Sequence, residues 1–468
     1  NLKNFTNFMN FIAEKLLFLR NETNLPISTP MKRLSFIIAL LALTCAAAWA
    51  EQPKYSDYFN KNGLRFDYFH SGDANSEAFH FKEFVDVPYY AGSKVNLIDT
   101  CGYGVYQIRL IDKESGKLIY QHNFNSLMQE WLTTPEAKQI NRSMPESVLL
   151  PMPKRPTELQ LWSRDKKLQW HHKYTHQINP DDYFIRKFKP WLESFDVSYM
   201  GNPDHCIDIV LISEGFTEAE KAQFIEDCDA FVDYLFSYAP YGDNKARFNV
   251  RAVWAPSLQS GVSIPGEDKW VNTACDARYY TFDSERYQMI TDMIRLSDIA
   301  SHVPYDLIYV ITNSQKYGGG AIYNWYGISA AHIKSRPAST RKTYAHEFGH
   351  LLLGLGDEYV GGAETDLYDL HEEPWEPNLT TLTNFDVKWK DLVDKSTPIP
   401  TPVPKGYSHQ QEYKMSDFKV GVYEGGGYLE KGIYRPVPNC MMNVMHTQDE
   451  FCPVCDRAIR AYIDFLTE

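Results

Sequence analysis

The chain has 468 residues and combines 44% apolar with 23% charged residues, which predicts a globular protein of two or three domains. Its net charge of −13 at pH 7 argues against nucleic acid or an anionic membrane surface as the main partner. Composition and charge leave the fold open.

Residues 31–50, MKRLSFIIALLALTCAAAWA, are typical of a secretory signal peptide. They combine a basic start, an apolar stretch and a terminal A-x-A sequence suited to cleavage. We therefore expect translation to start at Met31, residues 1–30 to be a non-native upstream extension, and the mature protein to have a secreted, periplasmic or cell-surface location. A lipid anchor at Cys45 is the alternative. No later stretch approaches about 18 apolar residues, so we expect no membrane span.

Residues 51–185 have the pattern of antiparallel strands. Residues 106–112 alternate apolar and polar side chains, and a polar turn separates them from a second predicted strand at 118–124. Residues 158–162 and 168–173 form another predicted pair. Repeated hairpins favour an antiparallel β-sandwich. No cluster of catalytic residue types lies here, so we expect an accessory domain.

Residues 186–468 are predicted to form a second, α/β domain. Residues 206–213 are almost continuously apolar, as expected of a strand buried on both faces. Thr217 and Glu220 match a capping box that would start the next helix. This helix is predicted to end near residue 237. Further strands are predicted at 248–255 and 306–312, and further helices at 284–297 and 453–466. Alternating strands and helices favour a mostly parallel sheet.

Gly318, Gly319 and Gly320 follow the last predicted strand of this sheet. Glycine in a strand lets another backbone approach closely, which is typical of a bend or a sheet edge. An extended peptide can pair with such an edge main chain to main chain. We therefore predict that these residues form an edge strand that binds substrate.

An HExxH sequence lies in the segment AHEFGHLLLGLGDEY. His346 and His350 are four residues apart, so on a helix they share one face and can bind one metal ion. Glu347 lies about 100° round the helix and can reach a water at the metal without binding the metal itself. Zinc lowers the pKa of such a water to about 7, so Glu347 can act as the general base. A chance match on an ordinary helix is the alternative, and Gly354 and Gly356, which can end the helix, argue against it.

This segment closely resembles the signature of the immunoglobulin A peptidase family, metallopeptidase family sixty-four. Four further stretches carry the same resemblance: LISEGFTEAE at 211–220, KYGGGAIYN at 316–324, GIYRPVPNCMMN at 432–443 and FCPVC at 451–455. The resemblance covers about 180–468, and the N-terminal region resembles the family's own N-terminal domain less specifically. It implies an α+β multidomain protein, in which a β-sandwich is followed by a metzincin-like α/β zinc endopeptidase domain. It does not establish immunoglobulin A as the substrate.

A catalytic zinc ion needs a third protein ligand. The metzincin pattern, HExxHxxGxxH or HExxHxxGxxD, resembles this chain, which has one extra residue before the glycine. The resemblance therefore implies Asp357 as the third ligand, with Glu358 as the alternative. If Asp357 is the ligand, Glu358 should point away from the ion. Glu372 or Glu373, from a later segment, is a further alternative.

The resemblance also implies a methionine turn beneath the zinc ion. Residues 440–443, CMMN, match that turn, and Met442 is the better candidate for its methionine. Both methionines could instead be ordinary core residues. The expected role of Met442 is packing and not catalysis.

Cys440, Cys452 and Cys455 lie close in sequence, with His446 between them. Three cysteines and one histidine can form a structural zinc site. A disulfide is the expected alternative in an exported protein. A redox role for the C-x-x-C pair is disfavoured, because no thioredoxin-like βαβ pattern surrounds it.

We expect a secreted endopeptidase with one catalytic Zn²⁺ ion and a protein or peptide substrate. A surface protein- or glycan-binding protein with a vestigial site is one alternative. A zinc aminopeptidase, in which Glu358 anchors the substrate amine, is another. Candidates for stabilising the oxyanion are His371, Tyr407, His409 and Tyr434.

Overall fold

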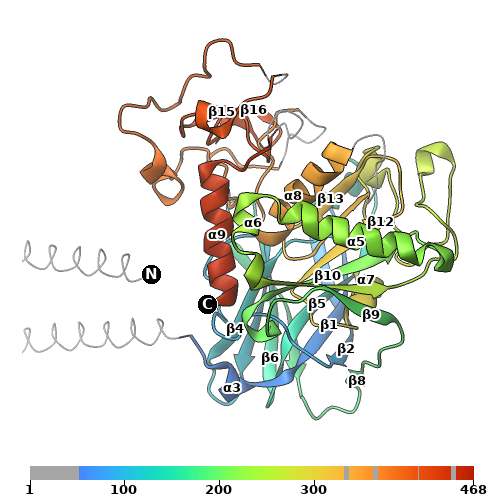
Figure 1. The fold of residues 1–468 in the computed structure, drawn as a ribbon. Helices are drawn as coiled ribbons and strands as arrows, with labels where there is room; N and C mark the ends of the chain where they lie inside the picture. The colour runs from blue at the N-terminus through green and yellow to red at the C-terminus, as the bar shows by residue number, and fades with distance from the viewer. Residues whose placement is uncertain (1–51, 331–336, 362–366, 409–410, 444–448) are drawn as a thin grey trace, which may run out of the picture. The chain divides into compact units, whose positions relative to one another are not determined.

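The structure is a computed structural model that describes residues 52–330, 337–361, 367–408, 411–443 and 449–468 (Figure 1). The predicted signal peptide and the upstream extension lie outside these residues. Residues 53–468 form one compact unit. Among the described helices, none is both long and apolar enough to cross a membrane.

The N-terminal region is rich in β-structure, as predicted, and its described strands form two four-stranded sheets. The first has the order β5-β1-β2-β8, with β1 at Phe59–Asp73, β2 at Ser76–Val87, β5 at Arg142–Pro153 and β8 at Arg186–Lys187. The second has the order β4-β3-β6-β7, with β3 at Tyr106–Asp112, β4 at Leu118–Phe124, β6 at Thr157–Arg164 and β7 at Trp170–Ile178. Short helices lie at Tyr55–Tyr58 (α3) and Leu127–Trp131 (α4).

Both predicted hairpins of this region are present. β3 pairs antiparallel with β4, and β6 pairs antiparallel with β7. Burial alternates along β6, since every second side chain faces the core. The period-two pattern in the sequence therefore identified strands that have one buried face.

A six-stranded sheet forms the centre of the α/β region, in the order β13-β14-β12-β10-β11-β9. Its strands are β9 at Glu193–Ser198, β10 at Ile207–Glu214, β11 at Phe248–Trp254, β12 at Leu307–Thr312, β13 at Gly319–Ile322 and β14 at Tyr326–Ala330. The four inner strands pair in parallel, and the two edge strands pair antiparallel. Every residue of β10 is buried, which explains its continuous apolar sequence.

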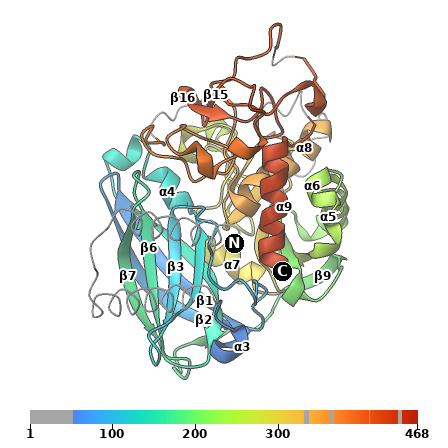
Figure 2. The same cartoon turned by 90° about the vertical axis from the view of Figure 1, so that its left-hand side faces the viewer.

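The helices of this region are α5 at Lys221–Leu235, α6 at Ala239–Gly242, α7 at Met293–Ala300, α8 at Pro337–Leu353 and α9 at Pro453–Thr467. The predicted capping box is present, since the Thr217 N–H and hydroxyl both donate to Glu220 Oε2, at 2.8 and 2.7 Å. The described residues between α8 and α9 are mostly irregular and include a hairpin of β15 (Tyr423–Gly426) and β16 (Leu429–Arg435), labelled in Figure 2.

The predicted helix at 284–297 is wrong over its first half, because α7 begins only at Met293. Tyr287 instead forms a β-bridge with Gly319, and Met289 forms one with Arg278. The Asp292 side chain then accepts a hydrogen bond from the Arg295 N–H at 2.9 Å and caps α7. Pairing with distant segments therefore overrides the local helical pattern.

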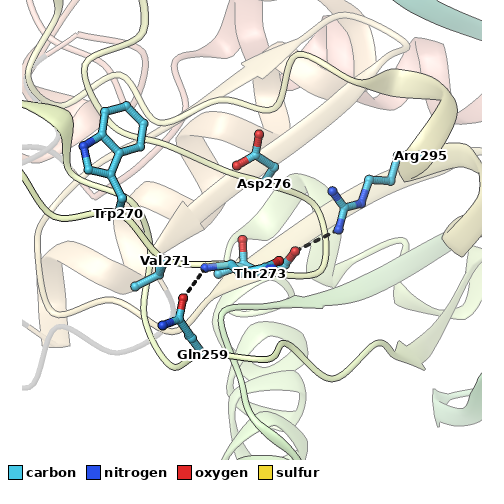
Figure 3. A pocket seen from close by; sticks show the side chains of 7 residues that line it. Gln259, Trp270, Val271, Thr273, Asp276 and Arg295 are labelled. Carbon is cyan, nitrogen blue, oxygen red and sulfur yellow. Dashed lines mark hydrogen bonds between the residues drawn. The ribbon is translucent and has the colours of Figure 1, made fainter.

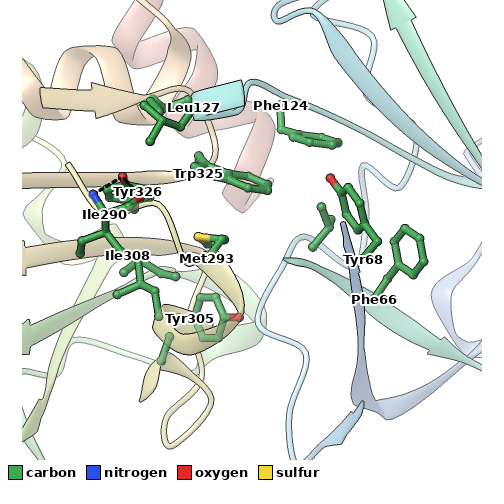
Figure 4. Packing of buried hydrophobic residues seen from close by; sticks show 14 of the residues in the cluster. Phe66, Tyr68, Phe124, Leu127, Ile290, Met293, Tyr305, Ile308, Trp325 and Tyr326 are labelled. Carbon is green, nitrogen blue, oxygen red and sulfur yellow. Dashed lines mark hydrogen bonds between the residues drawn. The ribbon is translucent and has the colours of Figure 1, made fainter. Parts of the chain in front are cut away.

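The two faces of the central sheet pack against different layers. Ile209 and Leu211 of β10 face a cluster formed with α5, α8 and α9. Val210 and Ile212, on the other face, belong to a cluster that also contains α7 and residues of both N-terminal sheets. Figure 4 shows this second cluster, with Phe66 and Tyr68 of β1 on one side and Ile308 and Tyr326 of the central sheet on the other.

The hydrophobic core therefore does not follow the predicted division at 185–186. Phe124 of β4, for example, stacks on Trp325, with ring centroids 5.4 Å apart. The boundary itself stays a prediction, but the two regions share one core.

Candidate active site and metal centre

Helix α8 carries the HExxH sequence on the wall of a cleft. Its apolar side chains, including Phe348, Leu351 and Leu352, are fully buried and fix the rotation of the helix. His346 is 4% exposed and His350 is half-buried, and both line the cleft. The helix ends at Leu353 and is followed by Gly354, whose φ of +65° favours glycine and where a Cβ would lie 2.4 Å from the Trp375 ring.

Both histidine rings are oriented by backbone carbonyls. His346 Nδ1 donates to the carbonyl of Met441 at 3.0 Å, and His350 Nδ1 donates to that of Leu355 at 2.5 Å. Since a carbonyl can only accept, Nδ1 carries a proton, and Nε2 is the nitrogen that can bind a metal ion in place of a proton.

Asp357 joins the two histidines. Its Oδ1 lies 3.2 Å from His346 Nε2 and 3.3 Å from His350 Nε2, and the two Nε2 atoms are 3.1 Å apart. Ligands of a tetrahedral ion at about 2.0–2.1 Å would be about 3.3 Å apart. Asp357 Oδ1 is buried and has no hydrogen-bond donor among the described residues. The donor set and the unpaired oxygen both fit a metal ion such as zinc.

The charges at this site depend on one another. Burial lowers the pKa of His350, but the Asp357 carboxylate outweighs this effect and raises it to about 9. Burial raises the pKa of Asp357, but the two histidines hold it well below its usual range. Glu347 lines the cleft beside them, and burial raises the pKa of its carboxyl.

Tyr428 is a site residue that the sequence did not indicate. Its hydroxyl donates to Asp357 Oδ2, and its ring packs edge-on against Tyr359, with centroids 5.2 Å apart. It belongs to the turn between β15 and β16, 71 residues beyond Asp357. No spacing rule connects the two positions, so only the fold could identify this contact.

Glu358 points away from the histidines. It is fully buried, and its Oε1 accepts from Asn378 Nδ2 at 2.9 Å and lies 3.3 Å from Cys455 Sγ. Glu372 and Glu373 line the cleft but are outside the His346–His350–Asp357 cluster. Of the carboxylates considered for the third ligand, only Asp357 is grouped with both histidines in the part of the chain that the structure describes.

Met442 packs beneath α8. Its Sδ atom lies 3.1 Å from the position that a Cβ of Gly349 would occupy, between the two histidines. Its carbonyl accepts from the Glu358 N–H at 2.7 Å. The turn that contains Met441 and Met442 therefore contacts His346 on one side and the chain after α8 on the other.

The cleft has a volume of about 1000 Å³ and is lined by both regions of the chain. Gly318, Gly319 and Gly320 lie on its wall, at the β13 edge of the central sheet. Residues of the N-terminal region also line it, among them Glu130, which accepts a hydrogen bond from the Tyr287 hydroxyl. The N-terminal region is thus more than a packing partner, because it helps to form the cleft.

Three of the four candidates for stabilising the oxyanion are described, and these three lie away from the metal centre. His371 is exposed, while Tyr407 and Tyr434 are part-buried, and none of the three lines the cleft. His409 and His446 lie outside the described residues. Tyr359 and Tyr428 are the tyrosines that line the cleft next to Asp357.

A smaller pocket of about 400 Å³ lies apart from this cleft (Figure 3). Gln259 Oε1 accepts from the Asn272 N–H at 2.7 Å, and the Arg295 guanidinium donates to the carbonyl of Thr273 at 2.9 Å. These contacts fix the surrounding loop. No residue of the HExxH sequence contributes to this lining.

Comparison with known families agrees with this geometry. Residues 196–417 and 408–463 match the family described as IgA Peptidase M64, and residues 54–175 match the Peptidase M64 N-terminus. No curated protein matches the chain. The peptidase match alone spans more than half of the sequence. The chain therefore belongs to the IgA peptidase M64 family and is a metallopeptidase.

Proposed function

We propose that this protein is an exported zinc endopeptidase that hydrolyses peptide bonds of extracellular proteins. The observation that carries the proposal is the convergence of His346 Nε2, His350 Nε2 and Asp357 Oδ1 beside Glu347 in the large cleft. Two imidazoles and one carboxylate suit a catalytic zinc ion, which keeps a further position open. The signal-like residues 31–50 support export. We further propose a metzincin-like catalytic fold that follows a β-sandwich.

His346, His350 and Asp357 would hold the ion, with Tyr428 fixing the orientation of Asp357. A bound zinc ion supplies Lewis acidity and lowers the pKa of a water molecule. Glu347 accepts a proton from the attacking water at its carboxylate and donates it to the leaving amine. The burial that raises the pKa of Glu347 makes it a better proton acceptor than an exposed glutamate.

The edge of β13 offers few free main-chain groups to a substrate. The Gly319 N–H already donates to the carbonyl of Arg286 at 3.2 Å, and the carbonyl of Gly318 accepts from the Ala330 N–H at 3.2 Å. Alternate residues of a strand direct their main-chain groups to the same side, so those of Ala321 face outwards as Gly319 does. We therefore propose that an extended peptide pairs with Ala321.

The buried position of Glu358 disfavours the aminopeptidase alternative. A substrate amine would need an acidic anchor that lines the cleft, and Glu358 is fully buried beside Cys455. The intact Glu347 and the preorganised histidines disfavour a vestigial site.

Glu347→Gln tests the proposal. This substitution keeps the shape of the side chain but removes the base, so kcat/KM should fall by about 10² to 10⁴. The zinc content should be unchanged, because Glu347 is not a ligand. Hydrolysis of an unfolded protein substrate and elemental analysis of the same preparation give both readouts. A variant that cleaves as fast as the wild type would refute the mechanism.

A further inference from the structure

Three segments of the chain converge behind the cleft at a second cluster of potential metal ligands. Glu358 comes from the chain after α8, Cys440 from the methionine turn, and Cys452 and Cys455 from the start of α9. One ligand atom of each lies within 4.8 Å of the others, and all four side chains are fully buried. None of the four belongs to the His346–His350–Asp357 cluster.

The spacing of these atoms fits a tetrahedral ion. Cys440 Sγ lies 3.9 Å from Cys455 Sγ, and Cys455 Sγ lies 3.3 Å from Glu358 Oε1. Zinc–sulfur bonds of about 2.3 Å and zinc–oxygen bonds of about 2.0 Å would separate two sulfurs by about 3.8 Å and a sulfur from an oxygen by about 3.5 Å. A disulfide would require the sulfurs to approach to about 2.05 Å. All three cysteines are unbridged.

Backbone groups are arranged to support thiolates here. The Cys452 N–H points to Cys440 Sγ at 3.2 Å, and the Cys455 N–H points to Cys452 Sγ at 3.4 Å. Cys452 also occupies the N-cap of α9, where the helix dipole favours negative charge.

Glu358 supplies an independent indication of a cation. Its Oε2 atom is buried and has no hydrogen-bond donor among the described residues. A buried carboxylate oxygen without a partner is costly, and a bound cation removes that cost. The nearby buried guanidinium of Arg435 interacts electrostatically with Glu358 but donates its hydrogen bonds to backbone carbonyls.

We propose that Glu358, Cys440, Cys452 and Cys455 bind a second, structural zinc ion. Three thiolates select zinc over harder cations such as magnesium and calcium. Glu358 is adjacent to Asp357, and Cys440 is adjacent to Met441, whose carbonyl orients His346. The ion therefore ties the chain after α8, the methionine turn and α9 together directly behind the catalytic centre. This inference does not depend on the proposed endopeptidase activity.

Metal content and a cobalt spectrum of the full mature chain test this proposal. The wild type should hold about two zinc ions per chain, and Cys455→Ser about one. After exchange with Co²⁺, the wild type should show sulfur-to-cobalt charge-transfer absorption, which Cys455→Ser should lose. His350→Ala should also lose one ion but keep this absorption, which distinguishes the two centres. Cys228→Ser, at a buried cysteine in α5, is the matched control and should keep both ions.

A wild-type chain with about one zinc ion, no sulfur-to-cobalt absorption and two thiols fewer than its cysteine count would overturn the proposal in favour of a disulfide. These three measurements need no variant, so they decide the matter even if Cys455→Ser fails to fold. An unchanged zinc content in His350→Ala would count against the catalytic centre and leave the structural site intact.

Discussion

Asp357 and Glu358 are neighbours in sequence, but their carboxylates belong to different clusters. The Asp357 carboxylate faces His346 and His350, while that of Glu358 faces Asn378 and Cys455. The Glu358 N–H also donates to the carbonyl of Met442, which holds the backbone at this point. The catalytic centre and the cluster of buried cysteines are therefore linked directly, through the peptide bond between Asp357 and Glu358.

Removing the Asp357 carboxylate should weaken binding of the catalytic metal, whereas removing the Glu358 carboxylate should not. Asp357→Ala should lose the catalytic zinc during dialysis against a mild chelator, and activity with it, because a direct ligand is gone. Glu358→Gln keeps Asp357 and both histidines, so it should retain the zinc that supports hydrolysis. Residual kcat/KM, measured after the same dialysis, separates the two variants, whereas total zinc content also reports on the second proposed site. The reverse order would make Glu358 the catalytic ligand.

At the scale of elements, His70 links the central strand β1 to both neighbouring strands. Its Nδ1 lies 3.2 Å from Glu146 Oε1 of β5, and its Nε2 lies 3.3 Å from Glu77 Oε2 of β2. The ring is fully buried. Burial lowers the pKa of His70, but the two carboxylates outweigh this effect and raise it to about 9.

This link predicts that stability depends on pH. The folded-state pKa of about 9 lies above the unfolded value of about 6.5, so the contribution is complete below pH 6.5 and is lost as the pH rises through 9. The free energy of unfolding should therefore fall between these values by up to about 3 kcal/mol. Denaturant titrations at both pH values measure the difference. His70→Gln is the control and should show a much smaller difference; an equal one would assign the effect to other groups.

The sequence correctly predicted the features that are determined by residues close together in the chain. The apolar run of β10, the capping box of Thr217 and Glu220, and the four-residue spacing of His346 and His350 are each set within one segment. The half of the predicted helix before Met293 was wrong because Tyr287 pairs with Gly319, which is distant in sequence.

Long-range contacts account for the parts of the site that sequence reasoning missed. Tyr428 reaches Asp357 across 71 residues, and Cys455 reaches Glu358 across 97. The cysteines themselves were recognised as a possible metal site, but their buried acidic neighbour was not. Only the folded chain brings that fourth group to them.

At the scale of the whole molecule, one core spans the N-terminal sheets and the central sheet. Phe124 and Trp325 stack across this boundary, and Tyr68 and Met293 belong to the same cluster. A hydrophobic cluster that both regions share favours one cooperative transition over two.

Residues 53–468 should therefore unfold in one calorimetric transition. Phe124→Ala removes a buried ring from the shared core and should destabilise the whole unit by about 3 kcal/mol without splitting that transition. Leu258→Ala, at a side chain that is 80% exposed, is the control and should change the stability very little. Two separate transitions in the wild type would show that the regions fold independently.

The shared core also affects which substrates the cleft should bind most tightly. The described residues that line the cleft, including Glu130 and its partner Tyr287, belong to this one unit, so the cleft lies within a unit and not between two. A peptide that binds in this cleft loses conformational freedom, which costs free energy. Segments that already favour an extended β-conformation, such as those rich in β-branched residues, lose the least. They should be bound more tightly than flexible, glycine-rich segments of the same length.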